Sequence, residues 1–298
     1  MRNRKMTNGQ KQQLIRDRAA ALLADGAVSC IVGWRQTRFA GKTAVCFVRA
    51  PEDATLLVWN EYTIPLTAKY LADERWTGGK AGILARGCDS KAINRLLRDN
   101  QLEREKLYIV GLPCEGKADE RCRPCRQKTP LVYDELLWEE DSAADGGGTS
   151  AADADAPGRG RFFRADEVSA LGIDARYDYW EDVYARCIRC YACRNACPVC
   201  SCRECYVDMH RAGFQSKRQN AADNRVFGVT RAFHVGDRCI ECGECERVCP
   251  MGLPILGQTQ KVIQTAEALA GAPYEAGLNA EDENFLGKFD LDDKDAFM

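Results

Sequence analysis

Residues 187–198, CIRCYACRNACP, and residues 239–250, CIECGECERVCP, carry the same pattern of four cysteines followed by a proline. In each run the cysteines are separated by two, two and three residues. Three thiols with two residues between them can bind one 4Fe–4S cluster within a tight loop, whereas the fourth thiol points away and binds the cluster of the other run. The doubled run therefore predicts two 4Fe–4S clusters and one-electron transfer.

This crossing of the fourth ligands assigns four cysteines to each cluster. The predicted sets are Cys187, Cys190, Cys193 and Cys249 for cluster 1, and Cys239, Cys242, Cys245 and Cys197 for cluster 2. Zinc is the alternative, because pairs of cysteines two residues apart also suit tetrahedral zinc. If the crossing holds, the segment 200–234 must return the chain to one compact core.

The composition indicates a soluble protein of a reducing cytoplasm. The chain has 298 residues, 17 cysteines and a formal net charge of -2, and no long basic block that would suggest nucleic-acid binding. Its polar start does not resemble an export signal, and no apolar run reaches the roughly 20 residues of a membrane span. Cysteines in such a protein are metal ligands or redox groups. Exposed clusters further suggest anaerobic metabolism.

An acidic stretch rich in Gly, Ala and Ser covers residues 139–160 and contains no aliphatic side chain larger than alanine. Such a composition predicts a flexible linker. We therefore expect an N-terminal domain over residues 1–138 and a domain with the two clusters over residues 161–298. The second is expected to be a bacterial-type ferredoxin-like α+β domain.

The N-terminal part predicts an α/β domain with a mostly parallel sheet. A helix is expected over residues 10–24, and strands are expected over 27–33, 43–49, 54–59, 81–85 and 107–112. Between the last two strands, Ala92, Ile93, Leu96 and Leu97 form one helical stripe. A strand, a helix and a strand within about thirty residues is typical of a βαβ unit with parallel strands.

Four more cysteines form a candidate third site in this domain: Cys88, Cys114, Cys122 and Cys125. Cys88 lies at the turn from a strand into the helix, which Asp89 or Ser90 is expected to cap. Cys114 follows the next strand, so parallel strands would bring both thiols to one edge of the sheet. The helix N-terminus should favour the thiolate of Cys88. The site would hold a third 4Fe–4S cluster or zinc; alternatively, Cys88 and Cys114 are buried, unligated side chains.

Five cysteines remain outside these sets. Cys30 and Cys46 lie within apolar strand-like runs and are expected in the core. Cys200, Cys202 and Cys205 directly follow the first run. They suggest either an additional metal site or packing beside a cluster.

Two pairs of segments carry a family resemblance: ILARGCDSKAINRLL with LYIVGLPCEG, and YARCIRCYACRNACPVCSCREC with RCIECGECERVCPMGLPI. Over about residues 27–130 and 175–256 the chain resembles the beta-subunit family of deazaflavin-coenzyme-reducing hydrogenases and dehydrogenases, and its bacterial dicluster-ferredoxin relatives. The cysteine runs follow the α/β region here, whereas in the family they precede it. The resemblance implies an iron–sulfur subunit that relays electrons between a flavoprotein and a redox partner. That partner would be a hydrogenase, a formate dehydrogenase or a heterodisulfide-reductase-like complex.

Two other functions stay open. Some members of the family bind FAD and reduce the deazaflavin coenzyme, so the chain could be an FAD-containing oxidoreductase acting on a soluble deazaflavin or nicotinamide cofactor. No flavin-contacting residue can be assigned in this sequence. A zinc-stabilised adaptor is the non-redox alternative.

Overall fold

The structure is a computed structural model that describes residues 6–72, 79–122, 125–139, 160–209, 216, 218–271 and 273–280. Most of the stretch expected to be a linker, residues 140–159, lies outside the described residues.

The N-terminal region is built on a five-stranded, mostly parallel sheet, as predicted. Its strands are β1 (Cys30–Gln36), β2 (Thr43–Val48), β3 (Ala81–Ala85), β4 (Leu107–Gly111) and β5 (Glu135–Leu136). They lie in the order β2-β1-β3-β4-β5, where β1 and β2 are antiparallel and the other neighbours are parallel. The parallel pairing of β3 with β4 confirms the expected βαβ unit.

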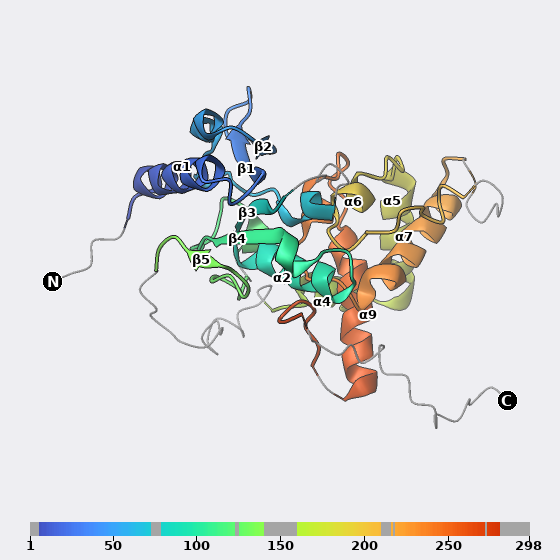
Figure 1. Ribbon diagram of the computed structural model, residues 1–298. Helices are drawn as coiled ribbons and strands as arrows, with labels where there is room; N and C mark the ends of the chain where they lie inside the picture. Colours follow the sequence, from blue (N-terminus) through green and yellow to red (C-terminus); the bar gives the residue numbers. More distant parts are fainter. Residues whose placement is uncertain are drawn as a thin grey trace.

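Helices cover both faces of this sheet. Helix α1 (Asn8–Ala24) shares a hydrophobic cluster with Leu84 and Val110, whereas α2 (Gly87–Arg98) shares another with Ile83 and Ile109. These pairs are neighbours along β3 and β4, and successive side chains of a strand point to opposite faces. Figure 1 shows the resulting layers, with α2 between the sheet and the C-terminal helices.

One expected strand, over residues 54–59, is wrong. Residues Pro51–Leu56 form a 3-10 helix, whose first turn suits the fixed φ of Pro51. Only Leu57 and Val58 reach the sheet: Leu57 forms an isolated bridge with Arg35, and the Val58 N–H donates to the Trp34 carbonyl. Further 3-10 turns are Ala68–Ala72, Arg104–Lys106 and Glu120–Cys122.

From residue 160 onward, the described residues form helices and loops without a strand, so the β part of the expected α+β domain is not found among them. The helices are α4 (Phe163–Ser169), α5 (Ile173–Arg186), α6 (Ala192–Ala196), α7 (Ala221–Gly236), α8 (Glu244–Arg247) and α9 (Ile255–Ala270). Helix α7 packs against both α5 and α9. Within the residues that the structure describes, no helix is long and apolar enough to cross a membrane.

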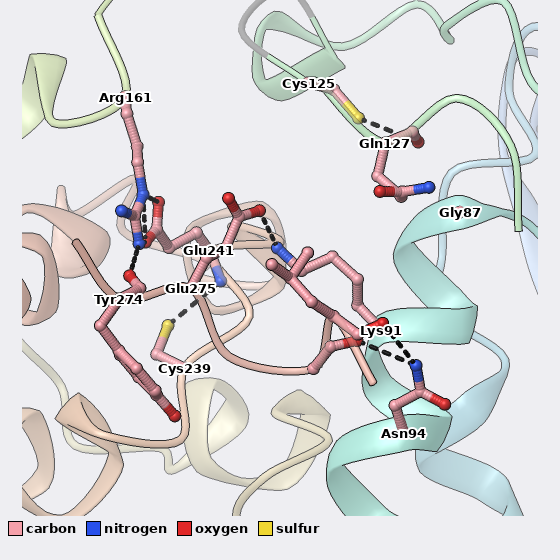
Figure 2. A network of polar contacts seen from close by, with 12 residues as sticks. Gly87, Lys91, Asn94, Cys125, Gln127, Arg161, Cys239, Glu241, Tyr274 and Glu275 are labelled. Carbon is pink, nitrogen blue, oxygen red and sulfur yellow. Dashed lines mark hydrogen bonds and ion pairs between the residues drawn. The ribbon is translucent and has the colours of Figure 1, made fainter. Parts of the chain in front are cut away.

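The two regions meet through α2 and the segment 273–278. Tyr274 and Ala276 belong to the same hydrophobic cluster as Ile93 of α2. In Figure 2, Lys91 of α2 reaches Glu275, with 2.5 Å between Nζ and Oε1. The Asn94 amide donates to the Gly277 and Leu278 carbonyls at 3.1 and 3.2 Å. The α/β region and the helical region therefore share part of their core.

Candidate metal centres

The two cysteine runs fold into loops with the same unusual backbone. In the first, Arg189 and Tyr191 have φ values of 47° and 60°; in the second, Glu241 and Gly243 have 57° and 66°. Positive φ is rare for residues other than glycine. Because both loops adopt it at the same two places, the repeat in sequence is also a repeat in backbone structure.

These loops direct backbone N–H groups at the first thiol of each run. The Arg189 N–H donates to the Cys187 Sγ, and the Glu241 N–H donates to the Cys239 Sγ, each at 3.4 Å. Hydrogen bonds of this type stabilise a thiolate and tune the potential of the metal that it binds. The loops therefore suit anionic sulfur ligands.

The structure brings the predicted ligands of cluster 1 together. They line a single hollow: Cys187, Cys190, Cys193 and Cys249. Asn224 of α7 holds the start of this loop, because its side-chain amide donates to the Tyr184 and Cys187 carbonyls at 2.9 and 2.7 Å. Among the twelve cysteines predicted to be cluster ligands, Cys190 alone is exposed.

The predicted ligands of cluster 2 also lie together, including the crossing Cys197. Burial raises the pKa of the Cys239 thiol, and the neighbouring Cys197 and Cys245 thiols raise it further. Burial likewise raises the pKa of Cys242, with Cys197 and Cys239 adding to the effect. Thiols packed this closely in the interior are destabilised as free anions, but they suit a bound cation or cluster.

The surroundings of this second set are rich in paired charges. Figure 2 shows Arg161 against Glu241, with 2.9 and 3.0 Å from Nε to the two carboxylate oxygens. Arg161 also forms an ion pair with Glu267 at 2.6 Å. Burial raises the pKa of Glu241, while Arg161 lowers it. At the equivalent position, the first loop has Arg189.

The third set of cysteines gathers at one edge of the sheet, as the parallel strands predicted. Cys88 lies in the first turn of α2 after β3, and Cys114 follows β4. Burial raises the pKa of Cys122, and Cys114 and Cys125 raise it further. Burial also raises the pKa of Cys88 well above its ordinary value, although Arg86 opposes this shift. Burial therefore dominates the pKa of the free Cys88 thiol, and the expected contribution of the helix N-terminus stays a prediction.

The local structure of α2 explains how the loop carrying Cys125 comes back to Cys88. A side chain at Gly87 would collide with the backbone carbonyl of Gln127, so only glycine lets this loop lie across the start of the helix (Figure 2). The expected cap is also corrected: the helix begins after Arg86, and Asp89 lies within its first turn. The Asp89 carboxylate accepts from the Arg86 N–H at 3.2 Å and from the Thr67 N–H at 2.8 Å.

Two cations, buried Arg86 and half-buried Lys117, lie beside the third set. Arg86 pairs with Asp89 at 2.8 Å and lies over the ring of Trp34. Its interaction with Cys88 and Cys114 raises its pKa, although burial acts in the opposite direction. Burial lowers the pKa of Lys117 to about 8, and Cys114 opposes that shift. A negatively charged cluster would offset the cost of burying these cations.

One cavity joins the third set to the second. Its walls include Cys88, Cys122 and Cys125 on one side and Cys242 on the other. Arg121 crosses it: the guanidinium donates to the Cys242 carbonyl at 3.3 Å and lies 3.7 Å from Glu244. No sequence pattern predicts this contact, because Arg121 and Cys242 are 121 residues apart.

The remaining cysteines do not form one set. Cys30 and Cys46 are buried in the core, as predicted. Cys200 hydrogen-bonds the thiol of Cys197, and this contact lowers the pKa of Cys197. Cys202 is exposed and Cys205 contacts Arg194. Packing of Cys200 beside a predicted ligand therefore agrees with one of the two interpretations of this segment.

In the described part of the chain, no group of three or more His, Cys, Asp or Glu side chains is arranged to hold a single metal ion. This finding concerns mononuclear sites, because a four-iron cluster sets its thiolates further apart than one ion does. The donors present are four-thiol sets with N–H groups directed at sulfur and with buried cations nearby. This donor chemistry fits 4Fe–4S clusters, and the ligand role of each cysteine stays a prediction.

Comparison with known proteins supports this chemistry. Residues 184–253 match the family model described as a 4Fe-4S dicluster domain. The F420-dependent formate dehydrogenase subunit beta of Methanocaldococcus jannaschii is 23% identical over 64% of this chain and 71% of the relative. The F420-dependent formate dehydrogenase 1 subunit beta of Methanococcus maripaludis is 34% identical over 36% of this chain. The acetyl-CoA decarbonylase/synthase complex subunit alpha 1 of Methanosarcina acetivorans is 33% identical over 34% of this chain.

The extent of these matches differs. The chain spans 71% of the relative from M. jannaschii but only 27% and 10% of the second and third relatives. The dicluster match covers both cysteine runs in full. The chain is therefore similar to F420-dependent formate dehydrogenase beta subunits, and its residues 184–253 match a 4Fe–4S dicluster domain.

Proposed function

We propose that this chain is an electron-transfer subunit in which three cysteine sets are arranged as a relay. The observation that carries the proposal is the cavity whose walls join Cys88, Cys122 and Cys125 to Cys242. This shared lining supports a position of the third set beside cluster 2. The pKa of Cys245 in cluster 2 responds to Cys193 of cluster 1, so these two sets are neighbours as well. The order along the relay is the third set, cluster 2 and cluster 1.

When bound, each cluster accepts and releases one electron at a time. The protein's own residues hold the ligands and exclude water from most of them. The two cysteine loops with positive φ direct backbone N–H groups at sulfur. Gly87 leaves room for the loop that carries Cys125, and Arg121 donates to the Cys242 carbonyl. Exposed Cys190 marks cluster 1 as the end of the relay that faces a partner.

The partners that fit this role are redox protein subunits. The named relatives are subunits of F420-dependent formate dehydrogenases and of an acetyl-CoA decarbonylase/synthase complex. We propose for this chain a flavoprotein at one end and a dehydrogenase, hydrogenase or heterodisulfide-reductase-like complex at the other. Neither direct insertion in a membrane nor nucleic-acid binding is part of the proposal.

Two finer points belong to the same proposal. The eight cysteines of the doubled run act as crossed ligand sets, as in a bacterial-type ferredoxin, which is supported by the shared backbone of the two loops. The division into an α/β domain over residues 1–138 and a cluster domain over residues 161–298 is also kept. Ile93 and Tyr274 belong to one hydrophobic cluster, so the two proposed domains differ in their chemistry but share part of their core.

Iron and sulfide analysis of the anaerobically purified protein tests the number of sites. At four irons per cluster, two clusters give about eight irons and three give about twelve. Replacing Cys88 by serine should lower a total of about twelve to about eight. The matched control is Cys46→Ser, a buried cysteine outside the three sets, which should leave the iron content unchanged. Unchanged iron in Cys88→Ser would overturn the third site.

A second measurement tests the relay against catalysis by this chain. Flavin released on denaturation, together with reduction of a deazaflavin or nicotinamide acceptor by the purified chain alone, would contradict a pure relay. Zinc in place of iron, without the visible absorbance of sulfur-to-iron charge transfer, would contradict electron transfer altogether.

A further inference from the structure

Arg231 lies in the interior, in the middle of α7. Only 5% of its surface is exposed, although arginine is seldom buried unless it is paired. Its Nη2 donates to the Cys193 carbonyl at 3.3 Å, and its Nε, also buried, has no hydrogen-bond partner among the described residues. A guanidinium keeps its charge in proteins, so this position carries a permanent buried cation.

The groups that act on this cation are thiols. Burial lowers the pKa of Arg231, but Cys197, Cys245, Cys200 and Cys193 raise it, and their effect prevails. In the opposite direction, Arg231 lowers the pKa of the Cys193 and Cys245 thiols. Cys193 belongs to the predicted ligand set of cluster 1, whereas Cys245 and Cys197 belong to that of cluster 2. The geometry agrees: Val235, one turn after Arg231 on α7, packs in one hydrophobic cluster with Cys197, and Arg231 itself contacts the Cys193 carbonyl, so Arg231 lies beside both sets.

Burying an unpaired cation costs several kcal/mol, and proteins offset this cost with a nearby negative charge. Two other buried arginines have a carboxylate partner: Arg86 pairs with Asp89, and Arg95 pairs with Asp99. For Arg231 the anionic groups at hand are the cysteine ligands. A 4Fe–4S cluster with four thiolate ligands is negatively charged in both of its common oxidation states, and it becomes more negative on reduction.

We propose that Arg231 is a shared counter-charge of the two clusters, which raises the reduction potential of both by stabilising their more negative, reduced forms. The inference rests on the proposed function, because it requires that both clusters are present. Arg231 acts on the clusters through its positive charge and needs no contact with iron.

The test is an EPR-monitored redox titration of the full-length protein and its Arg231→Gln variant. Loss of the positive charge should shift the one-electron reduction of both clusters towards the oxidised form by about tenfold, which is about 59 mV for one electron. Arg231→Lys keeps the charge and should shift both potentials less. The matched control is Arg225→Gln, six residues earlier on α7, where the arginine is exposed and pairs with Glu181 at 2.6 Å. This control should leave both potentials unchanged.

The outcomes separate the inference from the proposed function. Full iron content and two cluster signals in the parent protein support the relay whatever the variants do. Unchanged potentials in Arg231→Gln, or equal shifts in Arg231→Gln and Arg231→Lys, would overturn the role of the charge. If Arg231→Gln binds no iron but Arg231→Lys binds the full amount, the charge is needed for assembly, which supports the inference. Loss of iron from both variants would show a purely structural residue and overturn it.

Discussion

The outer loop (residues 187–197) and the inner loop (residues 239–249) have the same cysteine spacing and the same positive φ values, but their surroundings differ. Cys190 of the outer loop is exposed, whereas Cys245 at the end of the inner loop's triplet is buried. Arg189 stands in the outer loop where Glu241 stands in the inner loop. The comparison shows that the spacing of the ligands determines the backbone, and that residues brought in from elsewhere in the chain determine solvent access and charge.

The largest expected difference between the loops concerns loss of a ligand. Cys245→Ser should remove the inner cluster and about four irons, because this thiol is buried and no solvent ligand can take its place. Cys190→Ser should retain most of its iron in a converted cluster, since water can reach this site. Iron analysis and EPR spectra of the two variants check this. Equal losses of iron from the two variants would show that solvent access does not distinguish the loops.

Gly243, the fifth residue of the inner loop, provides the next comparison. Gly243→Ala would place a methyl group against the Arg121 side chain at a positive φ. We expect it to lower stability by about 2–4 kcal/mol, from backbone strain of about 1–2 kcal/mol and from overpacking.

The control is Gly252→Ala, where φ is also positive but a methyl group would have open space. The loss of stability in Gly252→Ala should be limited to the backbone strain of about 1–2 kcal/mol. Thermal unfolding of the loaded proteins gives the difference between the two variants. Equal losses would show that contact with Arg121 has no part in it.

A smaller effect is expected where α7 holds the outer loop. Asn224→Ala removes two hydrogen bonds to the Tyr184 and Cys187 carbonyls and should cost about 1–3 kcal/mol. The exposed Asn195 serves as control, and Asn195→Ala should stay within about 0.5 kcal/mol of the parent. Denaturant unfolding measures both. A neutral Asn224→Ala would mean that the cysteines alone hold the loop.

The smallest effect concerns the charges at the equivalent positions. Glu241→Gln removes a negative charge beside cluster 2 and should raise its potential, while Arg189→Gln removes a positive charge beside cluster 1 and should lower its potential. Each shift should be less than tenfold in the reduction equilibrium, below about 59 mV, because Arg161 already offsets Glu241 and solvent lies near the outer loop. Redox titration of each cluster measures the sign of its potential shift. Shifts of the same sign in the two variants would contradict the expected difference between the loops.

Much of the fold follows from local patterns in the sequence. The apolar stripe from Ala92 to Leu97 gave α2, and the β-branched runs on either side gave β3 and β4. The same unit placed Cys88 and Cys114 at one edge of the sheet. Residues 54–59 were misassigned because their apolar run resembles a strand, whereas Pro51 begins a 3-10 helix there.

What the sequence could not indicate are contacts between distant segments. Arg231 looks like an ordinary polar residue of a helix, and only the folded structure places it among thiols of both runs. Arg121 and Cys242 meet across 121 residues. The burial that raises the pKa of Cys88 likewise comes from the packing of several segments and not from its position in the helix.

The segment 273–278 has a consequence for biosynthesis. Lys91 and Glu275, which meet at the surface of α2, are 184 residues apart in the chain. At about 5–20 residues per second, roughly 10–40 s of translation separate them. During this interval the face of α2 that later packs on Tyr274 and Ala276 is uncovered. Cys88 lies in the first turn of the same helix. The α/β half therefore completes its hydrophobic core only after the segment 273–278 has been synthesised.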